Sequence, residues 1–123
     1  WVDDGRSSGG RGRLGMKRGD FVTIAVQGDF GKPRPALVIQ TDRVGDDFPS
    51  VTVLPVTSMV VPGQLIRVTV APSAENGLQK LSQVMVDKTM TVKREKIGAK
   101  LGAIDADGMK AVERNLAVFL GIA

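Results

Sequence analysis

The chain has 123 residues, with 17 Lys and Arg against 13 Asp and Glu, no His and no Cys, which gives a formal net charge of +4 at pH 7. This length indicates one domain, and the positive charge favours a polyanionic partner. The absence of Cys and His excludes disulfides, thiolate catalysis, histidine bases and the common zinc ligands, so any chemistry must use Arg, Lys, Asp, Glu, Ser or Thr.

The start of the chain differs in composition from the rest. Residues 1–15 contain Gly, Ser and Arg without periodicity, and we expect them to be a disordered or cloning-derived leader before one domain at residues 16–123. No run approaches the roughly 18 apolar residues of a membrane span, and no segment has the pattern of a signal peptide. We therefore expect a cytoplasmic protein without a membrane partner.

Strand patterns dominate the first half of the domain. The β-branched residues of 20–26 predict a first strand, which is followed by a loop with two glycines at 27–31. Residues 36–41 are nearly all apolar, which predicts a central strand buried on both faces. A polar surface loop at 42–50 then leads to a strand at 51–56.

The second half of the domain continues with shorter strands. Residues 65–70 alternate, which predicts a half-exposed strand with Arg67 and Thr69 on the solvent face. Another strand is expected at 81–87, and further extended chain at 89–93.

One helix is expected at the C-terminus. It begins at the N-cap residue Asp105 and ends at Gly121. Its apolar stripe comprises Met109, Val112, Leu116, Phe119 and Leu120. Five or more short strands and one helix predict a mainly β fold, in the form of a strongly bent sheet or small open barrel closed by the helix.

Two proline-containing segments carry candidate anion-binding groups. Pro33 and Pro35 stiffen the backbone around Arg34, whose planar guanidinium suits phosphate oxygens. Thr57 and Ser58 follow a second strand that has a proline near its end. Alone, Arg34 is also compatible with a surface residue of a turn, and the two hydroxyls with ordinary turn formation.

An acidic residue and a basic stretch follow the strand at 81–87. Asp87 is a candidate general base, and equally a residue that forms a solvated ion pair with Lys88. The stretch is suited to a phosphate backbone, although such runs are commonly solvated faces. Its basic residues are Lys88, Lys93, Arg94, Lys96 and Lys100.

The glycines of the first loop do not form a nucleotide site. Residues 28–31 lack the Walker and Rossmann spacings and no helix follows them, so no cofactor is expected. Phe30, at the tip of this loop, is placed either to stack on a base or to pack back into the core.

Several motifs in a fixed order resemble those of the MazF/PemK toxins, the mRNA interferases of type II toxin–antitoxin systems. The resemblance covers residues 16–123. Its motifs are Lys17-Arg18-Gly19-Asp20, Lys32-Pro33-Arg34-Pro35-Ala36-Leu37-Val38, Leu54-Pro55-Val56-Thr57-Ser58, Asn76-Gly77-Leu78 and Ser82-Gln83-Val84-Met85-Val86-Asp87.

The resemblance implies a small SH3-like twisted β-barrel with a C-terminal helix, which assembles as a homodimer. It also implies that Arg34 and Thr57 are the catalytic pair. In some relatives the aspartate that matches Asp87 is a general base beside an arginine two residues earlier. Here that earlier position is Met85, which shifts the weight to Arg34 and Thr57 and leaves Asp87 as the reserve base.

The activity implied is that of a metal-independent, ribosome-independent endoribonuclease. Such an enzyme cleaves single-stranded mRNA at specific sequences by attack of the 2′-hydroxyl on the adjacent phosphorus, and a cognate antitoxin with an acidic flexible tail neutralises it. The residues expected to bind RNA are Gly28, Phe30, Lys32, Ser58, Gln83, Lys88 and Lys93.

Two other functions fit the same composition. One is that of a non-enzymatic DNA gyrase poison similar to CcdB, although poisons of that type usually end in Trp, whereas this chain ends in Phe119-Leu120-Gly121-Ile122-Ala123. The other is an inactive SH3-like binding module, because a fold does not fix a function.

Overall fold

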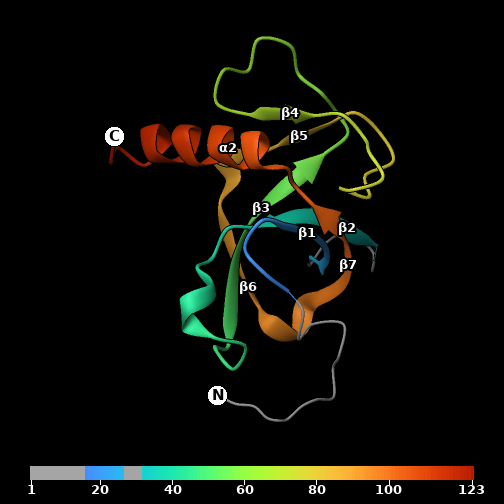
Figure 1. The fold of residues 1–123 in the computed structure, drawn as a ribbon, viewed down its shortest axis with the longest axis vertical. Coiled ribbons are helices and arrows are strands. Elements are labelled where there is room, and N and C mark those ends of the chain that lie inside the picture. The colour runs from blue at the N-terminus through green and yellow to red at the C-terminus, as the bar shows by residue number, and fades with distance from the viewer. Residues whose placement is uncertain (1–15, 27–31) are drawn as a thin grey trace.

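The computed structural model describes residues 16–26 and 32–123 (Figure 1). The leader expected at 1–15 therefore lies outside the described residues. The strands are β1 (Asp20–Ala25), β2 (Pro33–Val38), β3 (Ser50–Thr57), β4 (Val68–Val70), β5 (Ser82–Val84), β6 (Met90–Lys93) and β7 (Ile97–Ala103). The helix is α2 (Ala106–Phe119), and the short 3₁₀ turns are η1 (Asp42–Val44), η2 (Val86–Lys88) and η3 (Arg94–Lys96).

The strands form one curled antiparallel sheet in the order β4-β5-β3-β2-β1-β7, and β6 pairs with β3. Strand β3 organises this sheet, because β2 pairs along one of its edges while β6 and then β5 pair along the other. Pro55 lies where the partner strand changes from β6 to β5, and its carbonyl accepts a hydrogen bond from Met85 N at 2.9 Å. A proline without an N–H is tolerated at such a break in the ladder.

The curled sheet has an apolar core on each face. One cluster includes Val22, Ala36 and Val53, and the other, which includes Phe21 and Leu37, packs against α2. Alternate residues of β1 and β2 therefore enter different cores, as the pleat of a strand requires. The prediction that residues 36–41 are buried on both faces is confirmed for Ala36, Leu37 and Val38, but residues 39 and 40 are only half-buried and residue 41 is exposed.

Helix α2 lies across one end of the sheet, next to β4 and η2 (Figure 1). The Asp105 carboxylate accepts a hydrogen bond from Gly108 N at 2.7 Å, which confirms the predicted N-cap. Val112 is fully buried, but Phe119 and Leu120 are about half exposed, so the predicted apolar stripe is buried only over its first part. Within the described residues, no helix is long and apolar enough to cross a membrane.

Three predicted strands need correction. Strand β2 spans Pro33–Val38 rather than 36–41, so Arg34 lies inside the strand and not in a turn before it. The segment at 65–70 is a strand only over Val68–Val70, and the segment at 81–87 is a strand only over Ser82–Val84, after which the chain turns into η2.

Strand β7 was not predicted. It contains Gly98 and Gly102, which lower the local preference for a strand. Both positions need glycine for packing, because a Cβ on Gly98 would collide with the Thr23 hydroxyl and one on Gly102 with the Glu75 carbonyl.

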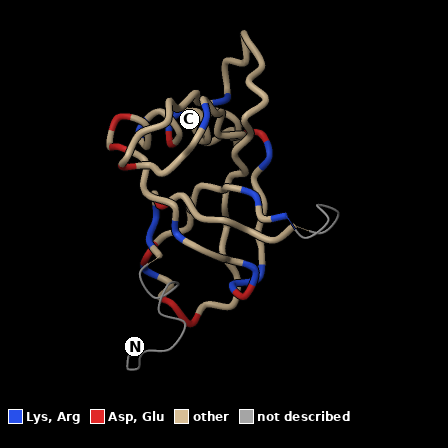
Figure 2. The backbone as a smooth tube through the Cα atoms, turned by 90° about the vertical axis from the view of Figure 1, so that its right-hand side faces the viewer, with Lys and Arg blue, Asp and Glu red and all other residues tan. Residues whose placement is uncertain are grey.

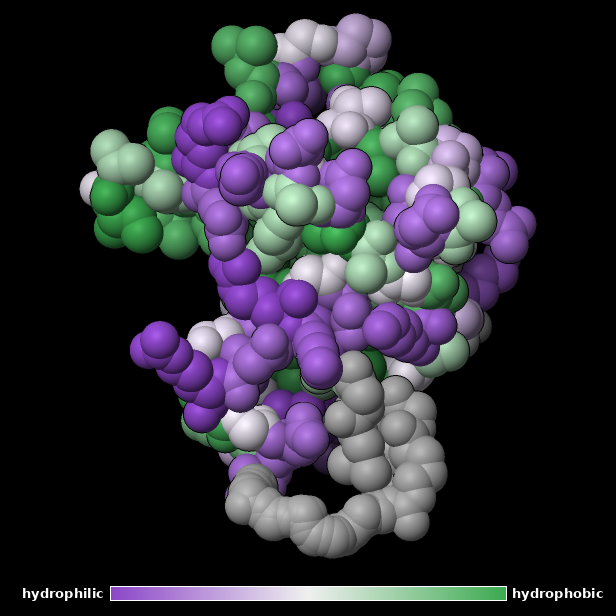
Figure 3. Space-filling view, in the orientation of Figure 1, coloured by the Kyte–Doolittle hydropathy of each residue, from purple (hydrophilic) through white to green (hydrophobic). Residues whose placement is uncertain are grey.

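Charged side chains are spread over the surface, whereas exposed apolar side chains gather in two places. Figure 2 shows Lys and Arg spread over several elements rather than gathered in one stripe. In Figure 3, apolar residues gather at the C-terminal end of α2 and on the loop before β4. The exposed residues there include Phe119, Ile122, Met59 and Leu65.

Candidate functional site

Arg34 projects from the first half of β2. It lies opposite Ile24 of β1 and on the same sheet face as Ala36 and Val38, at the end where that face opens to solvent. The Ile39 N–H points to β3, since it donates to Thr52 O at 3.1 Å, and alternation places the nitrogens of Pro35 and Pro33 on that side too. Because proline cannot donate, the β2–β3 ladder ends at the pair Ala36–Pro55.

Thr57 is the last residue of β3 and is half-buried. Continued two positions past Ala36–Pro55, the ladder register aligns Arg34 with Thr57, so the two residues flank the place where the strands part. Residues directly opposite each other in an antiparallel pair share a face. The Thr57 hydroxyl accepts a hydrogen bond from Met59 N at 3.1 Å, which orients the oxygen and leaves its hydrogen for a ligand.

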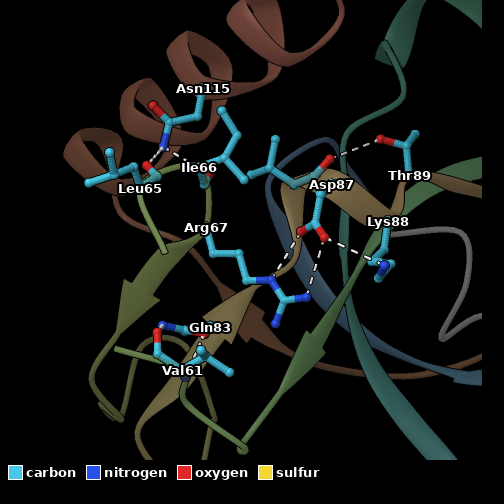
Figure 4. A network of polar contacts seen from close by, with 10 residues as sticks. Val61, Leu65, Ile66, Arg67, Gln83, Asp87, Lys88, Thr89 and Asn115 are labelled. Carbon is cyan, nitrogen blue, oxygen red and sulfur yellow. Dashed lines mark hydrogen bonds and ion pairs between the residues drawn. The ribbon is translucent and has the colours of Figure 1, made fainter. Parts of the chain in front are cut away.

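Gln83, which was expected to bind RNA, instead holds the loop after β3. It is opposite Thr57 in the β3–β5 pair but is only 3% exposed. Its amide accepts a hydrogen bond from Val61 N at 3.1 Å and donates one to Val61 O at 3.0 Å (Figure 4). Both ends of the amide are engaged, so any influence on a ligand passes through the position of this loop.

Asp87 forms a two-point contact with Arg67. Arg67 Nε donates to Oδ1 at 3.0 Å and Nη2 to Oδ2 at 3.3 Å, and Lys88 Nζ lies 3.6 Å from Oδ2 (Figure 4). The Arg67 side chain is 12% exposed, so the prediction that it faces solvent is wrong. As the alternation predicted, Arg67 lies on the opposite sheet face from Val68. That face is not open to solvent at Arg67, because Asp87 covers it.

The hydrogen bond from Arg67 holds the pKa of Asp87 below its ordinary value of 3.8, although partial burial opposes the shift. A carboxylate with both oxygens bonded and a lowered pKa is a weak proton acceptor. This geometry argues against Asp87 as a general base and gives it the role of holding Arg67.

The pair makes stability depend on pH. Because the pKa of Asp87 is lower in the folded than in the unfolded chain, the ionised pair stabilises the fold above about pH 4 and loses this effect as the pH falls through the lowered pKa. We expect Asp87→Asn to reduce the free energy of unfolding by about 2 kcal/mol at neutral pH, and by progressively less as the pH falls below about 4 and through the lowered pKa. Urea unfolding across this range measures it. The control is Asp46→Asn, the same change at an exposed residue. If Asp87→Asn lowered the free energy of unfolding equally at neutral and at acidic pH, the stabilising role of the ionised pair would be contradicted.

The other residues expected to bind RNA are only partly brought together. Lys32 is exposed two residues before Arg34, Ser58 is exposed directly after Thr57, and Lys88 is exposed beside Asp87. Lys93 lies opposite Ser50 at the far end of β3, and seven residues of strand at ~3.3 Å each separate it from Thr57 by roughly 23 Å. Gly28 and Phe30 lie outside the described residues.

The basic stretch at 88–100 does not form one continuous surface. Arg94 donates to the carbonyls of Phe48 and Gly45, and Lys100 lies 3.4 Å from Asp20. Across residues 16–26 and 32–123 there is no group of three or more Asp or Glu placed to hold a metal ion.

Comparisons with known proteins give the family. Residues 17–120 match the model of the PemK-like, MazF-like toxins of type II toxin–antitoxin systems, and the chain belongs to this family. A curated relative, the probable endoribonuclease MazF of Mycolicibacterium smegmatis, is 42% identical over 109 residues, which are 88% of this chain and 99% of the relative.

Solved structures agree with this assignment. The toxin MazF-mt6 of Mycobacterium tuberculosis superposes with a TM-score of 0.70 at 28% identity, covering 84% of this chain and 98% of that one. A MazE–MazF structure from Deinococcus radiodurans gives a TM-score of 0.71 at 24% identity, covering 88% and 97%, which is a likeness of fold. The predicted fold class, a mainly β barrel with a C-terminal helix, is confirmed.

Proposed function

We propose that this protein is an endoribonuclease that cleaves single-stranded RNA without a metal ion, with Arg34 and Thr57 as its catalytic residues. The observation that carries this proposal is the β2–β3 register, which, continued two positions past Ala36–Pro55, brings Arg34 opposite Thr57, whose hydroxyl is oriented by Met59 N. Membership of the toxin family and the name of the Mycolicibacterium smegmatis relative support RNA as the substrate.

The reaction is an internal transfer of the phosphoryl group. The 2′-oxygen attacks the adjacent phosphorus as its proton passes to water, the bond from phosphorus to the 5′-oxygen breaks, and the leaving oxygen takes up a proton. The products are a 2′,3′-cyclic phosphate and a 5′-hydroxyl. The Arg34 guanidinium stabilises the charge that develops on the phosphorane oxygens, and Thr57 donates a hydrogen bond to one of them.

Incubation with a long RNA of defined sequence in EDTA tests the proposal. We expect cuts at a recurring short sequence, because the resemblance to the mRNA interferases implies cleavage at specific sequences, and we expect fragments that carry cyclic phosphate ends. A supercoiling assay with DNA gyrase runs beside it. Intact RNA together with inhibited gyrase would contradict the proposal and favour the gyrase poison.

Loss of the Thr57 hydroxyl should slow cleavage strongly. Thr57→Val keeps the shape of the side chain but removes the donor, and we expect the kcat for RNA cleavage to fall by about 100-fold. Thr57→Ser keeps the hydroxyl and should retain most activity. Ser58→Ala is the matched control, since Ser58 is exposed one residue further on. Normal cleavage by Thr57→Val would remove Thr57 from the catalytic pair.

The proposed partners are a second copy of the chain and an antitoxin. The apolar residues left exposed at the end of α2, Val118, Phe119, Leu120 and Ile122, supply surface that such assembly would cover. The antitoxin is proposed to carry an acidic flexible tail that competes with RNA for Arg34, and the cytoplasm, where mRNA is found, is the proposed location.

A further inference from the structure

The Arg67–Asp87 pair lies on the same sheet face as Thr57. In the β4–β5 ladder, Val68 pairs with Val84 and Thr69 with Gln83, so the register continued by one position aligns Arg67 with Met85. Gln83 in turn pairs with Thr57. Because residues opposite each other share a face, Thr57, Gln83 and Thr69 form one row across β3, β5 and β4. Arg67, two residues before Thr69, lies on the same face.

Arg67 is fixed at both ends. Asn115 of α2 donates to the carbonyl of Ile66 at 3.0 Å, which holds the backbone immediately before Arg67, and Asp87 holds its guanidinium (Figure 4). The long side chain therefore does not have to lose its rotamer entropy when a ligand arrives. Such pre-organisation favours binding, because little side-chain entropy is lost when the ligand binds.

Asp87 does not use the guanidinium edge that carries Nη1, and the Arg67 side chain keeps 12% of its surface exposed. The bonds to Asp87 use Nε and Nη2. Among residues 16–26 and 32–123, no acceptor takes a hydrogen bond from Nη1 of Arg67. A guanidinium carries five N–H donors, so a phosphate oxygen can be bound through Nη1 while Asp87 keeps the opposite edge.

We infer that Arg67 binds an RNA phosphate next to the scissile one, and that Asp87 is the positioning residue that holds Arg67 in place. This inference rests on the proposed function. Two strand spacings of ~4.8 Å and two residue steps of ~3.3 Å place the Cα atoms of Arg67 and Thr57 about 12 Å apart, which suits neighbouring phosphates rather than a shared one. The scissile phosphate stays with Arg34 and Thr57.

The test compares Arg67→Gln, Asp87→Asn and the double variant with wild type. Binding of a 2′-O-methyl RNA, which cannot be cleaved, and cleavage of the matching RNA in EDTA are both measured over a range of salt. For Arg67→Gln we expect Kd and KM to rise about tenfold with kcat nearly unchanged, and the slope of log affinity against log salt to become shallower by about 0.7.

The Asp87 variants separate positioning from base catalysis. Asp87→Asn should weaken binding in the same direction, and adding it to Arg67→Gln should cost nothing further, because Asp87 acts through Arg67. Arg43→Gln removes the same charge from the exposed η1 turn, beyond the other end of β2, and should leave the salt slope unchanged. Unfolding midpoints identify any loss of fold, in which case Arg67→Lys, which keeps the charge, should retain the wild-type slope.

The outcomes distinguish the inference from the proposed function. Wild-type Kd and salt slope in folded Arg67→Gln would overturn the inference, and so would a collapse of kcat in Asp87→Asn alone, since that result marks a base. Wild-type protein that binds the 2′-O-methyl RNA through Arg67 but does not cut RNA would overturn the nuclease and leave the phosphate contact standing.

Discussion

Arg34→Ala is expected to lower the rate of RNA cleavage by about 100-fold to 1000-fold, the loss seen when one donor to a developing oxyanion is removed. Arg34 is exposed on β2, so truncation leaves no cavity in either core. The variant should therefore fold as wild type does. Single-turnover cleavage in EDTA measures the chemical step directly.

Two further variants qualify that result. Arg34→Lys keeps the charge but lacks the planar fork, so we expect it to recover only a small part of the rate. Arg43→Ala, the same change on the exposed η1 turn, should cleave at the wild-type rate. If Arg34→Ala cleaved RNA normally, the catalytic centre would have to be sought elsewhere.

Gly77→Ala is expected to have the largest effect on stability, lowering the free energy of unfolding by about 2–5 kcal/mol. Gly77 has a φ of +69°, which is unfavourable for residues with a Cβ. A Cβ here would also overlap the carbonyl oxygen of Leu101 and lie 2.6 Å from its carbonyl carbon. The loop that contains Gly77 packs on β7, where Ala103 N donates to Glu75 O at 2.9 Å, so the strand would have to shift.

Gly63→Ala is the matched control for this prediction. Gly63 has a similar φ of +78°, but a Cβ would meet nothing within 4 Å. Its free energy of unfolding should fall by only about 1–2 kcal/mol, which is the cost of placing a residue with a Cβ in the left-handed backbone conformation. Urea unfolding of both variants measures the difference, and equal losses would show that β7 yields easily to the added methyl group.

Local sequence patterns were sufficient to predict the elements whose residues have an intrinsic preference for the structure that they adopt. The N-cap Asp105, the β-branched first strand and the doubly buried segment at 36–38 all follow from short-range signals. Pro33 and Pro35 indicated a stiff backbone around Arg34, but the strand was predicted to begin only at residue 36, whereas β2 begins at Pro33.

The remaining features depend on contacts between distant segments. Gly98 and Gly102 oppose a strand by their own preference, yet each is needed where another segment approaches β7. Likewise, the alternation at 65–70 gives the face of Arg67 but not the carboxylate of Asp87, twenty residues away, that covers it. Pairing the predicted strands at 65–70 and 81–87 in register would have been the signal that placed Arg67 beside Met85.

The most direct test of the central claim uses one RNA in two forms, with the nucleotide before the mapped cut carrying either its 2′-hydroxyl or a 2′-hydrogen. If Arg34 and Thr57 stabilise attack by that hydroxyl, the first form is cut in EDTA to a 2′,3′-cyclic phosphate and a 5′-hydroxyl, and the second stays intact. Cleavage of the 2′-deoxy form at the same bond would contradict the account.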